Sequence, residues 1–225
     1  MRAVRYHSRP AHADQLHVEI WHNSQNLALD AGTYLYNAAA PWRNALRTAH
    51  VHNTLTVDGL DQMLPTSRFM WLDWADTDIL VSSPETITAR HDGYRKLGIT
   101  HQRTLQRSSP SAWEIMDEVL FSSPKTHQIT LHWLLPDLSF TVQKEDLHFD
   151  KPSFTMHFSN EQKLVSAIQV IRAGAFMVGQ SDMDTTIYGW FSPTYGVKQA
   201  ALSVLYSLQT DNPIILHTIW NFSEK

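Results

Sequence analysis

Short runs of alternating hydrophobic and polar residues recur along almost the whole chain, and this pattern constrains the fold more than any other feature. In residues 15–20, Leu16, Val18 and Ile20 alternate with polar residues, as in a β-strand with one buried face. Similar strand-length runs follow, separated by Asp-Gly, Ser-Pro and Asn-Pro turns. The sequence therefore predicts an all-β fold, a large antiparallel β-sandwich with few or no helices.

The predicted strands follow one another without a linker. Residues 68–74 predict an aromatic-rich strand, and only residues 164–170 and 198–206 also fit a helical pattern. No low-complexity stretch and no fixed-period repeat interrupts the chain, so a propeller is disfavoured. We expect a single domain over residues 1–225.

Composition excludes several classes of protein. The chain has 225 residues, no Cys, and a formal net charge of −4 from 18 basic and 22 acidic residues. Without Cys there is no disulfide framework, thiolate metal site or thiol nucleophile. Mild acidity argues against binding to nucleic acid or to an anionic membrane. No signal-peptide-like run follows Met1 and no run reaches the roughly 20 apolar residues of a membrane-spanning helix, so the compartment stays open.

Histidine and aspartate residues gather in three motifs near the N-terminus. His12 lies in Pro-Ala-His-Ala-Asp, Asp30 in Leu-Asp-Ala-Gly-Thr-Tyr, and His52 in His-Val-His-Asn-Thr. Imidazole nitrogens and carboxylate oxygens are common zinc ligands, and these spacings allow the three residues to meet from neighbouring strands. A chain with 13 His also contains such pairs by chance, so ordinary core or surface histidines are the competing interpretation.

A second metal hypothesis uses a different carboxylate. His12 and Asp14 with a later histidine have the form of a 2-His-1-carboxylate iron site, which would make the chain an iron-dependent oxygenase. That site needs a distal histidine near an arginine that binds a 2-oxo acid. His91 and Arg103 are the candidates for these two roles.

Several further motifs occur in a fixed order along nearly the whole chain. They are Arg9 to His17, Leu29 to Tyr34, His52 to Gly59, Asp61 to Met63, Trp71 to Trp74, His91 to Tyr94, Leu131 to Leu135 and Trp190 to Gly196. Together they resemble the heparinase II/III-like family, in its C-terminal β-sandwich domain. That domain belongs to bacterial polysaccharide lyases that act on heparin, heparan sulfate or alginate.

The resemblance implies a metal site and a location. In the family the metal, usually zinc, is held at positions that fall on His12, Asp30 and His52, and its role is mainly structural. Asp14 and Asn53 are adjacent to these ligands and are candidate partners for the histidine rings. Relatives are mostly periplasmic or secreted.

The resemblance also implies that the active site is incomplete. The lyases carry a catalytic histidine two residues before the first metal-binding histidine, and here that position is Pro10, which has no titratable group. The other catalytic groups of the family lie on an α/α toroid domain that is absent from this chain. We therefore expect the catalytic residues to be unassignable and the chain alone to be weakly active or inactive.

The segment between the second and third metal motifs holds the candidate substrate-binding residues. Arg43, Arg47 and His50 carry cationic or titratable groups that could contact an acidic polysaccharide, and Trp42 is expected at the surface. Solvated loop charges are the competing interpretation. A non-catalytic module that binds acidic glycans or has a structural role is the alternative function.

Overall fold

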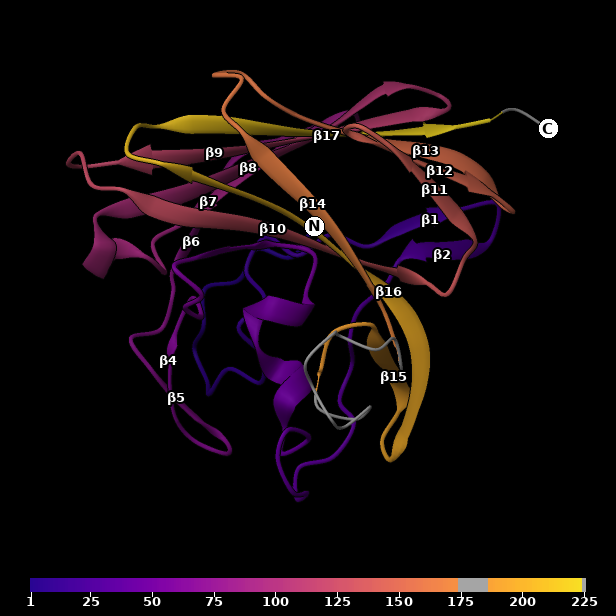
Figure 1. Ribbon diagram of the computed structural model, residues 1–225. Coiled ribbons are helices and arrows are strands. Elements are labelled where there is room, and N and C mark those ends of the chain that lie inside the picture. Colours follow the sequence, from indigo (N-terminus) through magenta and orange to yellow (C-terminus); the bar gives the residue numbers. More distant parts are fainter. Residues whose placement is uncertain (174–185, 224–225) are drawn as a thin grey trace.

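The computed structural model describes residues 1–173 and 186–223, and these form two facing antiparallel sheets (Figure 1). The larger sheet consists, in spatial order, of β11 (Phe140–Gln143), β12 (Asp146–Asp150), β13 (Ser153–Asn160), β17 (Ile214–Phe222), β9 (Ala112–Phe121), β8 (Ile99–Ser109), β7 (Thr86–His91) and β6 (Thr77–Ser82). The smaller sheet consists of β14 (Ser166–Arg172), β16 (Val197–Thr210), β10 (His127–Pro136) and β3 (Leu55–Val57), with β15 (Trp190–Thr194) also paired to β16.

Two hairpins and three short 3-10 turns complete the described elements. The hairpins pair β1 (Ile20–His22) with β2 (Gln25–Ala28) and β4 (Leu64–Ser67) with β5 (Met70–Leu72). The 3-10 turns are η1 (Ala45–Arg47), η2 (Ala49–Val51) and η3 (Arg95–Leu97). Residues 1–173 and 186–223 contain no α-helix, so none is present that could cross a membrane.

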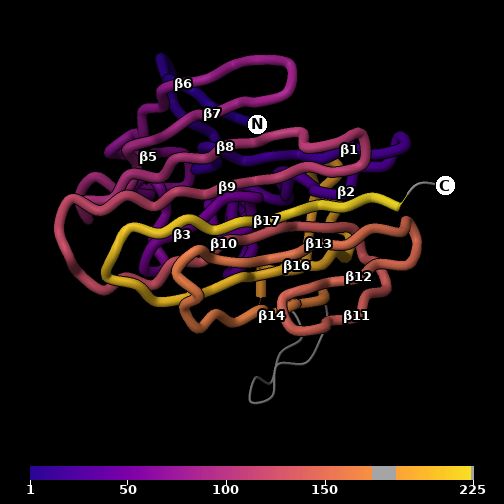
Figure 2. The backbone as a smooth tube through the Cα atoms, turned by 90° about the horizontal axis from the view of Figure 1, so that it is seen from above, coloured from indigo at the N-terminus to yellow at the C-terminus, as the bar shows by residue number. Residues whose placement is uncertain are grey.

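The predicted β-sandwich is confirmed. Strands β14 and β16 occupy most of the two stretches that also fit a helical pattern. The aromatic strand expected over residues 68–74 is shorter than predicted, because only Met70–Leu72 pairs with β4. Figure 2 shows the strands of both sheets crossing the molecule in similar directions when it is viewed from above.

Stacked aromatic side chains join the two sheets. Phe154 stacks on Phe149 with ring centroids 4.3 Å apart and on Trp220 with centroids 5.4 Å apart. Trp220 of the larger sheet meets Trp133 of the smaller sheet edge to face at 5.3 Å. All four side chains are buried, and alternation along β13 and β17 directs Phe154 and Trp220 inward. Aromatic burial between the sheets therefore stabilises the sandwich.

Strand β10 is buried on both faces towards its end, because the loops that carry the Asp30 and His52 motifs cover its outer face. Alternation along β10 directs Trp133 into the sandwich and Leu134 to the opposite side, yet both are completely buried. Leu134 packs with Leu29, Leu46 and Val51, and the Leu29 N–H donates to the Leu134 carbonyl at 2.8 Å. The N-terminal loops therefore form a third layer, below the sheets in Figure 1.

A row of buried polar side chains crosses β7, β8 and β9. The Gly93 N–H donates to His91 Nδ1, His91 Nε2 lies 3.1 Å from His101 Nδ1, and His101 Nε2 lies 2.6 Å from Asp117 Oδ1. One neutral tautomer of each ring satisfies all three contacts. Burial lowers the pKa of His91 and of His101. Burial alone would raise the pKa of Asp117, but Arg103 and His101 bring it to about 2.

This row makes stability depend on pH. The folded-state pKa of His91 lies well below 6.5, so the unfolded chain binds the additional proton, and stability falls as the pH drops below the unfolded-state pKa. For His91 alone the loss is about 1.4 kcal/mol between about pH 7.5 and about pH 5.5, and His101 adds in the same direction. Urea unfolding of metal-free protein at both pH values measures this loss of stability. His91→Gln is expected to remove the His91 share, and an unchanged pH dependence would contradict the assignment.

Candidate metal centre

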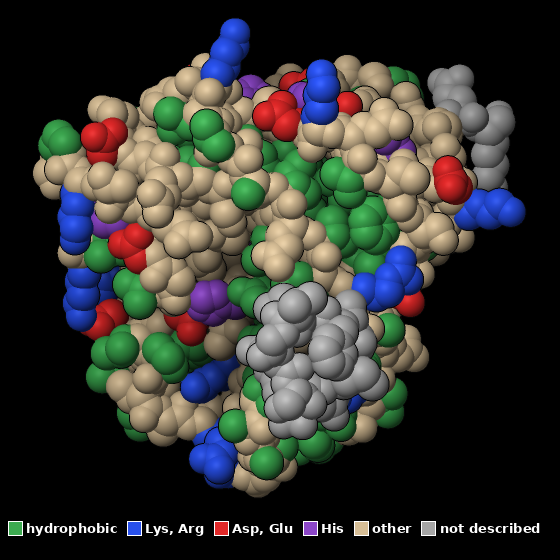
Figure 3. Space-filling model, in the orientation of Figure 1, with side chains coloured by type: hydrophobic (Ala, Val, Ile, Leu, Met, Phe, Trp, Pro, Cys, Tyr) green, Lys and Arg blue, Asp and Glu red, His purple; other side chains and the backbone are tan. Residues whose placement is uncertain are grey.

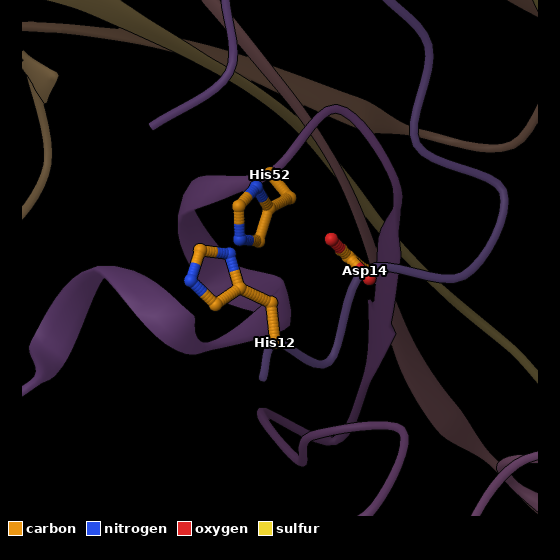
Figure 4. Close-up of side chains that lie close together, drawn as sticks. All are labelled: His12, Asp14 and His52. Atoms are coloured by element: carbon orange, nitrogen blue, oxygen red, sulfur yellow. The ribbon is translucent and has the colours of Figure 1, made fainter. Parts of the chain in front are cut away.

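Two groups of potential metal ligands share His52. One contains His12, Asp14 and His52, and the other contains His17, Asp30 and His52. In each group one ligand atom per residue lies within 4.8 Å of the others. The ring centroid of His52 lies 5.1 Å from that of His12 and 5.3 Å from that of His17. Figure 4 shows ring nitrogens of His12 and His52 facing one another, with Asp14 to one side.

The backbone around each residue explains this convergence. His52 directly follows η2, where its N–H bonds to Ala49. His12 precedes Ala13, whose N–H donates to the Arg47 carbonyl at 2.8 Å and so holds this segment against η1, the turn before η2. Asp30 follows β2, and its Oδ1 accepts the Gly32 N–H at 2.6 Å. Three loops of the third layer therefore meet at one point, and we call these segments, which carry His12, Asp30 and His52, the metal loops.

The electrostatics favour cation binding by neutral histidines and an ionised carboxylate. Burial, aided by the neighbouring His52, lowers the pKa of His12 to about 4. Burial likewise lowers the pKa of His52 and of His17. Burial alone would raise the pKa of Asp30, but His52, His17 and the Gly32 N–H bring it below its ordinary value. At neutral pH the imidazole lone pairs are therefore available.

Unpaired nitrogens provide a direct test of whether these residues suit a metal. Both ring nitrogens of His52 are buried without a hydrogen-bond partner. Leaving a buried polar atom unpaired costs roughly 1–3 kcal/mol. A zinc ion takes nitrogen and oxygen ligands of this kind. The residues present therefore fit a divalent metal centred on His52.

A backbone N–H that donates to its ring separates His17 from the other candidate histidines. The Asn53 N–H donates to His17 Nδ1 at 2.9 Å, so the neutral ring carries its hydrogen on Nε2, which lies 3.6 Å from Asp30 Oδ2. A protonated ring nitrogen has no lone pair for a metal. In this tautomer His17 is a partner for the Asp30 carboxylate and not a ligand.

Asp14 is also committed to another partner. Arg2 Nε lies 2.8 Å from Asp14 Oδ1 in an ion pair, and burial raises the pKa of Asp14. Asp30 is therefore the better carboxylate ligand of the two. The predicted set of His12, Asp30 and His52 is divided between the two groups, with His52 in both.

The predicted ring partners differ in what they contact. Asn53 is completely buried, and its N–H reaches the ring of His17. Its side-chain amide donates to the carbonyl oxygens of Val18 and Leu29 at 2.8 and 3.0 Å, and its Oδ1 accepts the Leu134 N–H at 2.6 Å. Asn53 thus links the metal loops to β10.

The candidate substrate-binding residues lie on η1, on η2 and just before η1. Arg43 is exposed and donates to the Ala38 carbonyl. Arg47 donates to the carbonyls of Ser67 and Arg68 at 2.8 and 2.7 Å, so part of its guanidinium is occupied by the β4–β5 hairpin. His50 is half-buried, two residues before His52.

The surface position expected for Trp42 is wrong. Trp42 is buried, with a relative exposure of 9%. Its ring meets Trp190 and Tyr34 edge to face, and Lys198 Nζ lies 3.8 Å from its centroid. The turn-like residues around Trp42 did not reveal this packing, because Trp190 and Lys198 are distant in sequence.

His91 and Arg103, the candidates for the iron hypothesis, belong to neither ligand group. His91 is bonded to Gly93 and His101, and Arg103 to Asp117. His17 and Arg2, by contrast, were not assigned as site residues from the sequence. His17 ends the same motif that contains His12, which is the one local signal for it.

The fold and the ligand groups together define a large antiparallel β-sandwich with a candidate metal centre in loops beneath its smaller sheet. In the view of Figure 3, one histidine side chain lies beside acidic and basic side chains at a hollow in the surface. Residues 2–217 match the family described as heparinase II/III-like, C-terminal. The chain belongs to this family.

Known relatives agree with this assignment. A heparin-sulfate lyase of Bacteroides stercoris is 29% identical over 136 residues, which cover 58% of this chain and 19% of that protein. A heparinase III structure with methylated lysines has a TM-score of 0.72 at 18% identity, covering 95% of this chain and 30% of that one. Heparan sulfate lyase HepC from Pedobacter heparinus has a TM-score of 0.68 at 14% identity, covering 95% and 31%. The chain thus spans less than a third of the length of these relatives.

Proposed function

We propose that this chain is the β-sandwich part of a lyase that cleaves uronic-acid-containing polysaccharide, of the heparin or heparan sulfate type, by β-elimination. Membership of the heparinase II/III-like family carries the proposal, together with the heparin-sulfate lyase relative. β-Elimination removes the C5 proton of the uronate and expels the sugar linked at C4. It needs a base, an acid and a group that neutralises the carboxylate.

We further propose that His12, Asp30 and His52 hold one structural zinc. The buried, unpaired nitrogens of His52 are the single observation that best supports it. Bound zinc would cross-link the three loops that carry these residues. The iron hypothesis uses Asp14 in place of Asp30, and the ion pair of Asp14 with Arg2 makes it the weaker candidate.

The active site is proposed to be completed by an α/α toroid domain. Pro10, at the position of the family's catalytic histidine, supplies no acid or base. Many large apolar side chains are exposed on and around β4, β5 and β6, which is typical of a surface that another domain covers. They are Leu60, Leu64, Met70, Leu72, Trp74, Ile79, Leu80 and Val81.

An exposed cluster of aromatic and cationic side chains supports acidic-glycan binding. The Phe69 ring lies 5.1 Å from that of Tyr36, and the guanidinium carbons of Arg9 and Arg68 lie 5.4 and 5.9 Å from its centroid. Aromatic faces pack on sugar rings, and arginine binds sulfate or carboxylate groups in bidentate fashion. Such a surface suits a sulfated uronic-acid polymer.

The purified chain alone is expected to bind heparin but to release no unsaturated uronate. Ultraviolet absorbance of the new C4–C5 double bond measures turnover, and retention on immobilised heparin at increasing salt measures binding. The double variant Arg9→Ala/Arg68→Ala is expected to elute at lower salt, because two contacts between arginine side chains and the anionic groups of heparin are lost. Arg107→Ala, which removes an exposed arginine outside this cluster, on strand β8, is the control.

Turnover by the isolated chain would contradict the proposal that its active site is incomplete. Binding without turnover, retained after a toroid domain is added, would favour the alternative of a non-catalytic glycan-binding module.

A further inference from the structure

Arg103 is a buried cation that connects the larger sheet to the metal loops. Strand β8 carries it, it is 0% exposed, and Asp117 faces it on β9. Two hydrogen bonds join the pair, Nε to Oδ1 at 2.7 Å and Nη2 to Oδ2 at 3.0 Å. The third nitrogen, Nη1, donates to the carbonyl oxygens of Leu16 at 2.7 Å and Asn53 at 2.5 Å.

These two carbonyls adjoin the two histidines at the centre of the site. Leu16 directly precedes His17, and Asn53 directly follows His52. Neither carbonyl belongs to a residue of a described strand, so neither is fixed by a sheet ladder. One guanidinium group therefore joins both loops to the larger sheet.

The backbone at Leu16 needs such a contact. Its φ is 60°, which lies in the left-handed region that is unfavourable for leucine. The Leu16 N–H donates to the Arg2 carbonyl at 2.7 Å, and Arg103 binds the Leu16 carbonyl on the other side. The surrounding hydrogen bonds thus hold a conformation that sets the direction of His17.

Stability alone is a poor reason for this ion pair. Removing two charges from water is costly, and hydrophobic replacements of buried ion pairs are often neutral or stabilising. A role in geometry accounts for the arrangement, because a planar fork with five donors can bind a carboxylate and two carbonyls at once.

We infer that Arg103, held by Asp117, is a positioning residue that fixes the backbone next to His17 and His52 for metal binding. The inference rests on the proposed metal site. It assigns the metal loops a support on β8 and β9, outside the N-terminal motifs that contain the candidate ligands.

The double variant Arg103→Met/Asp117→Asn tests this inference, because it removes both charges and leaves an amide to pair with His101. Zinc affinity, measured by competition with a chromophoric chelator, is expected to fall about 10- to 100-fold, with cooperative unfolding retained. The control is Glu118→Gln. Glu118 pairs with Gln102 at 2.9 Å in the adjacent register position of the same two strands. The zinc affinity of the Glu118→Gln variant is expected to equal that of the wild type.

A second measurement uses metal-free protein. The Asn53 N–H, bonded to His17 Nδ1, is expected to exchange with deuterium at least about tenfold faster in the double variant than in the Glu118→Gln control. If the double variant does not fold, Arg103→Lys replaces it, because an ammonium group keeps the charge but lacks the fork that spans both carbonyls.

The two measurements separate this inference from the proposed function. Wild-type affinity and unchanged Asn53 exchange in the variant overturn the positioning role and leave the metal site standing. If the wild type binds no zinc, the metal site fails. Faster exchange in the variant then still supports the control of loop geometry by Arg103, and unchanged exchange overturns it.

Discussion

Replacing His52 with alanine is expected to abolish zinc binding and the stability that zinc provides. Wild-type protein should contain about one zinc per chain, and at free zinc about 100-fold above the dissociation constant the ion stabilises the fold by about 2.7 kcal/mol. In the presence of a chelator, the variant lacks the packing of the His52 ring but also lacks its two buried, unpaired nitrogens. These effects oppose one another, so the free energy of unfolding of the variant should be close to that of metal-free wild type. Elemental analysis and urea unfolding with and without zinc measure both effects.

His157→Ala is the matched control, because His157 pairs with Asp146 on the distant strands β12 and β13. Its zinc content should equal that of the wild type. Wild-type protein without metal, or a His52→Ala variant with full metal content, would contradict the proposed site.

The same assay of metal content distinguishes the two candidate carboxylate ligands. Asp30→Ala is expected to lose the metal and Asp14→Ala to retain it, whereas the reverse result would favour the iron hypothesis.

Replacing Asn53 with alanine is expected to cost about 3–6 kcal/mol of folding stability. The substitution leaves three buried backbone groups, at Val18, Leu29 and Leu134, without their partner, and each unpaired group costs roughly 1–3 kcal/mol. Partial entry of water reduces the sum towards the lower value. Urea unfolding of metal-free protein measures this loss without a contribution from the metal.

Asn26→Ala is the control for Asn53→Ala. The Asn26 amide donates to Glu19 at an exposed position, and its loss should change stability by less than about 0.5 kcal/mol. If Asn53→Ala costs less than about 1 kcal/mol, Asn53 does not join the metal loops to β10 as described. An Asn53→Ala chain that does not fold would agree with a cost at the upper end of the range.

Local sequence patterns were sufficient for the fold class but not for the third layer. Alternation in β13 and β17 reflects one buried and one exposed face, which a period of two records directly. In β10 both Trp133 and Leu134 are buried, because loops from elsewhere cover the outer face. No local pattern contains that information, and the burial of Trp42 was missed for the same reason.

The same reasoning applies to the candidate site. His12, Asp30 and His52 stand in short motifs that can be recognised one at a time. The role of His17 depends on a hydrogen bond from Asn53, 36 residues further along the chain, and Arg103 reaches Leu16 across 87 residues. Contacts of this length follow from strand pairing and are invisible until the register is known.

The order of the elements along the chain has a consequence for synthesis. The metal loops are translated before β3, β8, β9 and β10, which support them. Strand β3 pairs only with β10 among the described strands, and β10 pairs in turn with β16, at residues 197–210. During synthesis on the ribosome, these loops therefore lack their final partners until most of the sandwich has emerged. The candidate metal centre is thus expected to be among the last parts of the described fold to form, and metal binding there would report that the sandwich has closed.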